Sequence, residues 1–156
     1  MRITLILIAK TSNNHIAALC EEYKRRLSHY VHFNIEILSL PKKKKFSSQE
    51  QQKEEEGRLI LSKIASGDRL VLLDEKGVEY TSKSFANYIE KKQNQSLKSL
   101  VFVVGGPYGV SPELMQRANE KIAVSQMTFS HQMVRMIFVE QLYRAYTIIK
   151  GESYHH

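Results

Sequence analysis

Apolar runs alternate with amphipathic segments along the whole chain. The apolar runs span residues 3–9, 33–40, 69–73, 100–104 and 122–124. Each is short enough for a strand, and the segments that follow place apolar residues three and four positions apart, as in a helix with one buried face. This order predicts an α/β fold with a mostly parallel, five- or six-stranded sheet and helices on both faces. Because no repeat or linker interrupts the pattern, residues 1–156 are predicted to form a single domain.

Polar residues and glycine mark the ends of several predicted helices. Ser111-Pro112-Glu113 combines a capping hydroxyl, a proline at the first helical position and a carboxylate near the positive end of the helix dipole. Ser47 or Ser48 can cap an earlier helix. The longest helix is predicted over residues 131–150, and Gly151 ends it.

The longest predicted helix is apolar on two sides. One stripe contains Val134, Ile137, Phe138, Leu142, Ala145 and Ile149, and a second contains Met133, Met136, Tyr143 and Tyr146. A helix that is apolar on two sides must be covered on both. The first stripe can pack on the sheet, so the second predicts contact with another chain, most simply in a twofold homodimer.

Three turns follow predicted strands and are candidates for a ligand site. They span residues 73–77, 105–109 and 125–129. Turns after parallel strands meet at one edge of the sheet, where they can line a single pocket. We expect backbone groups and apolar side chains there, with no lysine or arginine, which suits an adenosine-type ligand better than a triphosphate. Asp74 and Glu75 are either ordinary turn residues or ligands of a ribose hydroxyl, and the glycines of 105–109 alone are equally typical of a simple turn.

Charge and composition narrow the choice of partner and compartment. The formal net charge is +7, which favours a polyanionic partner. Lys42 to Lys45 and Lys24 to Arg26 are each either a solvated surface or a contact with nucleic-acid phosphates. No apolar run is long enough to span a membrane and no secretory cleavage site follows the first run, so a cytoplasmic protein is expected. The single cysteine, Cys20, excludes an intrachain disulfide and a cysteine zinc cluster, and no metal is expected.

Several motifs together resemble the RlmH (YbeA) family of SPOUT methyltransferases. They are residues 102–109, the segment 125–131 with Arg135, residues 140–145 and the terminal Tyr154-His155. The likeness covers the whole chain. Two positions depart from the family pattern: Ser130 stands where proline often precedes the histidine, and His156 stands where lysine or arginine usually follows the tyrosine and histidine.

The resemblance implies a fold, a cofactor and a substrate. The C-terminal part would form a trefoil knot, and the protein would be a homodimer that uses S-adenosylmethionine to methylate N3 of a pseudouridine in 23S rRNA of the ribosome. The cofactor would contact Leu73, Gly105, Val124, Ser125, Gln126, Met127, Thr128 and Phe129. The C-terminal tail would close over this site.

The resemblance also suggests roles for four residues in catalysis. Methylation at N3 requires loss of the proton on that ring nitrogen, and because this imide is only weakly acidic, a base or a field that favours the anion helps. His155 is the candidate proton acceptor or relay, and Tyr154 is expected to position the base. Arg144 or His131 is expected to contact phosphate or order the tail, although His131 can equally stabilise the turn before its helix. Two alternatives stay open at this point: a non-catalytic RNA- or ribosome-binding protein, and an enzyme that acts on a soluble nucleotide.

Overall fold

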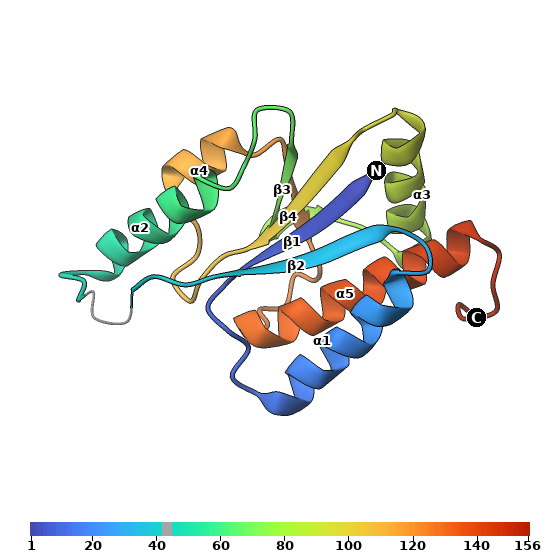
Figure 1. The fold of residues 1–156 in the computed structure, drawn as a ribbon, viewed down its shortest axis with the longest axis horizontal. Coiled ribbons are helices and arrows are strands. Elements are labelled where there is room, and N and C mark those ends of the chain that lie inside the picture. The colour runs from blue at the N-terminus through green and yellow to red at the C-terminus, as the bar shows by residue number, and fades with distance from the viewer. Residues whose placement is uncertain (42–44) are drawn as a thin grey trace.

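A computed structural model describes residues 1–41 and 45–156 and contains one parallel sheet (Figure 1). The five strands of the described chain lie in the order β2-β1-β4-β3-β5, and every neighbouring pair is parallel. Their bounds are β1 Arg2–Ile8, β2 His32–Leu38, β3 Arg69–Glu79, β4 Ser99–Val104 and β5 Glu120–Ala123. The predicted parallel α/β fold is confirmed, and the trefoil knot stays a prediction.

Helices cover both faces of the sheet. One face carries α1 (Asn14–Leu27), α3 (Ser82–Asn94) and α5 (His131–Ile149), and the other carries α2 (Gln49–Leu61) and α4 (Pro112–Arg117). Successive side chains of a strand point to opposite faces, so β1 supplies both cores. Its Leu5 packs in the α1–α3–α5 core, and its Ile6 packs in the α2–α4 core. Each of these fully buried aliphatic side chains contributes roughly 1.5–3 kcal/mol.

The predicted capping residues occupy the ends of the helices. Ser48 accepts a hydrogen bond from the backbone N–H of Gln51, and Ser111 accepts one from that of Leu114. Gly151 follows α5 with φ of +68°, a conformation that favours glycine. The lysine run that the sequence singles out falls on residues 42–44, outside the described residues, except for Lys45. None of the described helices is long and apolar enough to cross a membrane.

β3 is longer than its apolar run, and the residues predicted as a turn, 73–77, lie within it, where the pairing with β5 is interrupted. The strand continues to Glu79 beside β5, with a shift of register between Leu73 and Val78. Gly77 allows this pairing, because a Cβ there would lie 2.6 Å from the backbone of Ile122. Pairing with β5 resumes at Val78 and Glu79, opposite Ile122 and Ala123, so backbone pairing carries the strand beyond its apolar run.

Part of each apolar stripe of α5 is buried within one chain. Tyr146 is fully buried, and the ring of Tyr143 packs edge-on against Tyr23 of α1 at 5.6 Å and against Tyr30 at 6.0 Å. The tyrosines of the second stripe therefore do not by themselves require another chain, because Tyr23 of α1 and Tyr30 pack against them. Met133, near the first turn of α5, remains 41% exposed.

A buried arginine ties α5 to the end of β1. The side chain of Arg135 is inaccessible to solvent, and its guanidinium donates to the carbonyl of Ile8 at 2.6 Å and to that of Ala9 at 3.0 Å. A third bond reaches Thr11 Oγ1 at 3.0 Å. Ala9 has φ of +60°, which is rare for a residue with a side chain. Arg135 thus fixes the chain where it leaves the sheet, and burial lowers the pKa of its guanidinium.

Replacing Arg135 by lysine is expected to destabilise the fold strongly. A single ammonium cannot reproduce the fork that reaches three acceptors, and unpaired buried carbonyls are costly. We expect Arg135→Lys to lower the free energy of unfolding in urea by about 2–4 kcal/mol. The exposed Arg25→Lys is the matched control and should change it little. Equal stability of the two variants would contradict the role given to Arg135.

Candidate functional site

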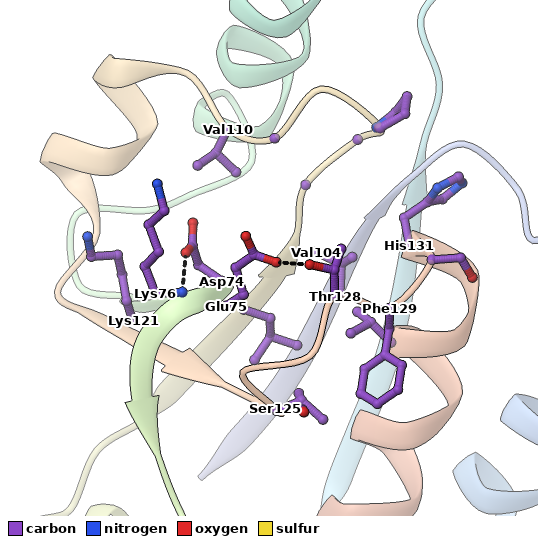
Figure 2. A pocket seen from close by; sticks show the side chains of 18 of the residues that line it. Asp74, Glu75, Lys76, Val104, Val110, Lys121, Ser125, Thr128, Phe129 and His131 are labelled. Carbon is purple, nitrogen blue, oxygen red and sulfur yellow. Dashed lines mark hydrogen bonds between the residues drawn. The ribbon is translucent and has the colours of Figure 1, made fainter.

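A cavity of about 660 Å³ lies at the carboxyl edge of β3, β4 and β5. It is lined by residues 73–76 of β3, by the glycine loop, by residues 124, 125 and 127–130 of the segment that leads into α5, and by the first turn of α5. Figure 2 shows these segments around the cavity. The prediction that three segments from separate strands line one pocket is confirmed, because parallel strands bring their carboxyl ends together.

The glycine loop, residues 105–109, presents backbone to the cavity. The N–H of Gly109 donates to the carbonyl of Gly106 at 3.1 Å, and Gly109 has φ of +85°. A Cβ on Gly105 would lie 2.9 Å from Cγ1 of Val110 and 3.0 Å from the carbonyl oxygen of Gly109. The tight turn therefore excludes a side chain at Gly105, and a ligand can approach the main chain closely.

Side chains of β3 hold the segment between β5 and α5. Thr128 Oγ1 donates to Glu75 Oε2 at 2.7 Å, which Figure 2 shows as a dashed line. Gln126 Nε2 donates to Glu79 Oε2 at 2.7 Å. Gln126 is the one predicted cofactor contact that does not line the cavity, whereas Leu73, Gly105, Val124, Ser125, Met127, Thr128 and Phe129 all do. The extended part of β3 thus forms one wall of the cavity and also holds a second wall, the segment that leads into α5.

The cavity contains charged side chains that the sequence analysis did not expect. Lys76 and Lys121 line it together with Asp74 and Glu75, so the prediction of a pocket without lysine is wrong. Figure 2 shows both lysines on the same side of the cavity as Asp74. Lys76 follows Asp74 and Glu75 on β3, and Lys121 lies on β5 opposite Leu72 of β3, so the pairing of these two strands brings both lysines to the cavity. Only knowledge of that pairing would have identified Lys121.

His131 lies at the first turn of α5 and lines the cavity. Burial and the nearby charge of Arg135 lower the pKa of its imidazole below the usual value of 6.5. The ring is therefore mostly neutral at pH 7, so one ring nitrogen can accept a hydrogen bond.

The other three predicted catalytic residues form a separate cluster at the far end of α5. Arg144 Nη2 donates to Glu140 Oε1 at 2.7 Å, an ion pair between residues four positions apart on α5. The hydroxyl of Tyr154 donates to the same oxygen at 3.0 Å, and the Arg144 guanidinium lies 4.5 Å from the centre of the Tyr154 ring. Nδ1 of His155 lies 3.5 Å from Arg144 Nη1. The cluster orders the tail on α5.

Tyr154 makes a further contact with α1. Its hydroxyl lies 3.1 Å from that of Tyr23. Burial, with the bonds to Tyr23 and Glu140, raises the pKa of the Tyr154 hydroxyl. Tyr154 is thus protonated at neutral pH and can donate a hydrogen bond, but it does not supply a base.

In one chain the tail does not reach the cavity. Arg144 lies thirteen positions after His131 on one continuous helix, and at 1.5 Å per residue this is about 20 Å. Figure 1 shows the C-terminus beside the last turns of α5, at the opposite end from the segment that lines the cavity. The expectation that the tail closes over the cavity is therefore not met within a single chain. The sequence placed all four predicted catalytic residues on or just after α5. It did not show that His131 lies at one end of this helix and the other three at the opposite end.

Metal ligands are not grouped in the part of the chain that the structure describes. No set of three or more histidine, cysteine, aspartate or glutamate side chains there can hold an ion. Cys20 is a buried free cysteine, and burial raises the pKa of its thiol.

Comparison with known proteins identifies the family. A family model described as "Predicted SPOUT methyltransferase" matches residues 1–155. The chain is 53% identical over its full length to a protein of Christiangramia forsetii, of which it covers 99%. It is 54% identical to one from Parabacteroides distasonis, again over the full chain and 99% of the relative. Both relatives are named "Ribosomal RNA large subunit methyltransferase H". The chain therefore belongs to the RlmH family of SPOUT methyltransferases.

Proposed function

We propose that this protein uses S-adenosylmethionine to methylate N3 of a pseudouridine in 23S rRNA of the large ribosomal subunit. The observation that carries the proposal is the cavity at the carboxyl edge of the sheet, in a chain that matches the family over its full length. Its relatives are named as methyltransferases of large-subunit ribosomal RNA. A basic protein with a net charge of +7 suits this polyanionic substrate.

The residues that line the cavity fit S-adenosylmethionine. A volume of about 660 Å³ lies in the range of small-molecule sites. Leu73, Val124 and Phe129 offer apolar surface for the adenine ring, and the bare backbone of Gly105 allows close approach. Lys76, Lys121, Asp74 and Glu75 provide both signs of charge, which matches a donor that carries a carboxylate, an ammonium and a sulfonium. When bound, S-adenosylmethionine would supply the electrophilic methyl group and a nearby positive charge.

The protein's own contribution is to align the base and to remove its N3 proton. When the protein holds the reacting nitrogen in line with the methyl group, a reaction between two separate molecules becomes effectively unimolecular and therefore faster. His131 is neutral at pH 7 and lines the cavity, so it can accept a hydrogen bond from the base or from a bound water molecule. His155 is the proposed proton acceptor or relay. Tyr154 positions the base as a hydrogen-bond donor, and Arg144 orders the tail or contacts phosphate.

These roles require a second copy of the chain. His131 lies at the cavity, whereas Tyr154, His155 and Arg144 gather at the other end of α5. A twofold homodimer that runs two α5 helices in opposite directions would bring the tail of one chain to the cavity of the other. The exposed Met133 near the first turn of α5 and the exposed Leu19 on α1 are apolar surface available for such a contact. We infer a cytoplasmic homodimer in which residues 1–156 act as one domain.

Methyl transfer to ribosomes tests the proposal directly. The protein is incubated with methyl-labelled S-adenosylmethionine and unmethylated ribosomes, and the label is mapped by nuclease digestion and mass spectrometry. We expect label on N3 of a single pseudouridine of 23S rRNA, because one shaped cavity must accept the base. Free nucleosides are the control and should remain unlabelled.

The alternatives give other results in the same experiment. Donor binding without label in RNA would mean that the acceptor is different. Ribosome binding without donor binding would favour a non-catalytic RNA-binding protein.

Removal of the tail is expected to separate catalysis from donor binding. A chain that ends at Ser153 lacks Tyr154 and His155 but retains every residue that lines the cavity. Loss of an acid–base group costs about 10²–10⁴-fold in rate. We therefore expect methyl transfer to fall at least a hundredfold, with donor affinity measured by calorimetry nearly unchanged. A chain that lacks only His156 is the matched control, and full transfer by the chain ending at Ser153 would refute the role of the tail.

A further inference from the structure

α2 buries a carboxyl group that the proposed reaction does not use. Glu56 is only 4% exposed. Its Oε1 accepts a hydrogen bond from Gln52 Nε2 at 2.8 Å, whereas its Oε2 has no hydrogen-bond partner among residues 1–41 and 45–156. Burial raises the pKa of this carboxyl. Burying a carboxyl with an unmade hydrogen bond is costly, so its presence calls for a physical reason.

The Glu56 carboxyl lies directly behind the glycine loop. Gly106 lines the cavity. A Cβ on Gly106 would lie 2.2 Å from Oε2 of Glu56, 2.9 Å from its Cδ and 3.1 Å from its Oε1. The carboxyl therefore fills the space that a side chain at Gly106 would occupy, and it supports the loop from the side opposite to solvent.

The next residue of α2, Gly57, makes a similar contact just after the glycine loop. A Cβ on Gly57 would lie 2.1 Å from Oγ of Ser111 and 2.8 Å from its Cβ. Ser111 is buried and caps α4 through the N–H of Leu114. Consecutive residues of α2 thus contact the segment 106–111 at both of its ends, so α2 limits how far the glycine loop can move back from the cavity.

We propose that Glu56 is a positioning residue for the donor cavity and acts through Gly106. Its carboxyl would not touch the donor. It holds the glycine loop in the conformation that the donor requires, so that binding does not have to order the loop. The inference rests on the proposed function for the identity of the donor. The contact joins residues fifty positions apart, and no sequence pattern links them.

A double-mutant cycle on donor affinity tests this role. We expect Glu56→Ala to weaken the binding of S-adenosylmethionine about tenfold by calorimetry, because the loop loses its support. Gly106→Ala should cause a similar loss, because the new Cβ meets the carboxyl. The two losses should not add. In the double variant the Cβ enters the space that the carboxyl vacates, and affinity should return to within about threefold of the wild type.

Conservative and control variants separate positioning from simple destabilisation. Glu56→Gln keeps the shape and can still accept from Gln52, so its affinity should lie within about twofold of the wild type. Glu54→Ala on the same helix removes an exposed carboxylate and should have no effect. KM for the RNA should stay unchanged in every variant.

The outcomes distinguish this inference from the proposed function. Additive losses in the double variant, or wild-type affinity in Glu56→Ala, would overturn the role of Glu56 while the proposed function stands. If the wild-type protein does not bind S-adenosylmethionine at all, the proposed function fails instead. Should Gly106→Ala not fold, the contrast between Glu56→Ala and Glu56→Gln still decides, since equal affinities would overturn the inference.

Discussion

Parallel pairing of β3 with both β4 and β5 is the constraint on which the cavity depends. β4 leads into the glycine loop, β5 leads into the segment before α5, and β3 lies between them. Because all three strands point the same way, their carboxyl ends form one edge. The close backbone contact at Gly77 lets β3 continue along β5, where Glu75 and Glu79 hold the third wall through Thr128 and Gln126. In a sheet with another strand order, the three segments that line the cavity would not lie next to one another.

α5 separates the chemistry of the chain into two places. Its first turn carries His131 into the cavity, and its last turns order the tail through Glu140 and Arg144. The buried Arg135 fixes the helix to the end of β1, so the two places stay a helix length apart. A rigid helix of this length cannot fold back on itself. The proposed active site is therefore built from two chains, and the apolar surface left near Met133 is consistent with such an arrangement.

Local patterns in the sequence predicted most of the fold. Apolar runs and caps such as Ser111 with Pro112 report on neighbouring residues, and the structure confirms them. The failures have one physical cause, which is contact between residues far apart in the chain. The extension of β3 depends on β5, Lys121 reaches the cavity because β5 pairs with β3, and Tyr143 is covered by Tyr23 of α1. Sequence motifs identified the residues of the candidate site. Only the structure showed that His131 lies at one end of α5 and that Arg144, Tyr154 and His155 lie at the other.

A mixed-dimer experiment tests most directly whether the tail of one chain serves the cavity of another. One chain carries a large side chain at Gly105, which the tight turn excludes, and the other ends at Ser153. Each should be inactive in methyl transfer alone. When the two are unfolded and refolded together, half of the dimers are mixed and each holds one complete site, so about a quarter of the wild-type activity should return. No recovery, with mixed dimers shown to be present by mass spectrometry, would contradict a site shared between chains.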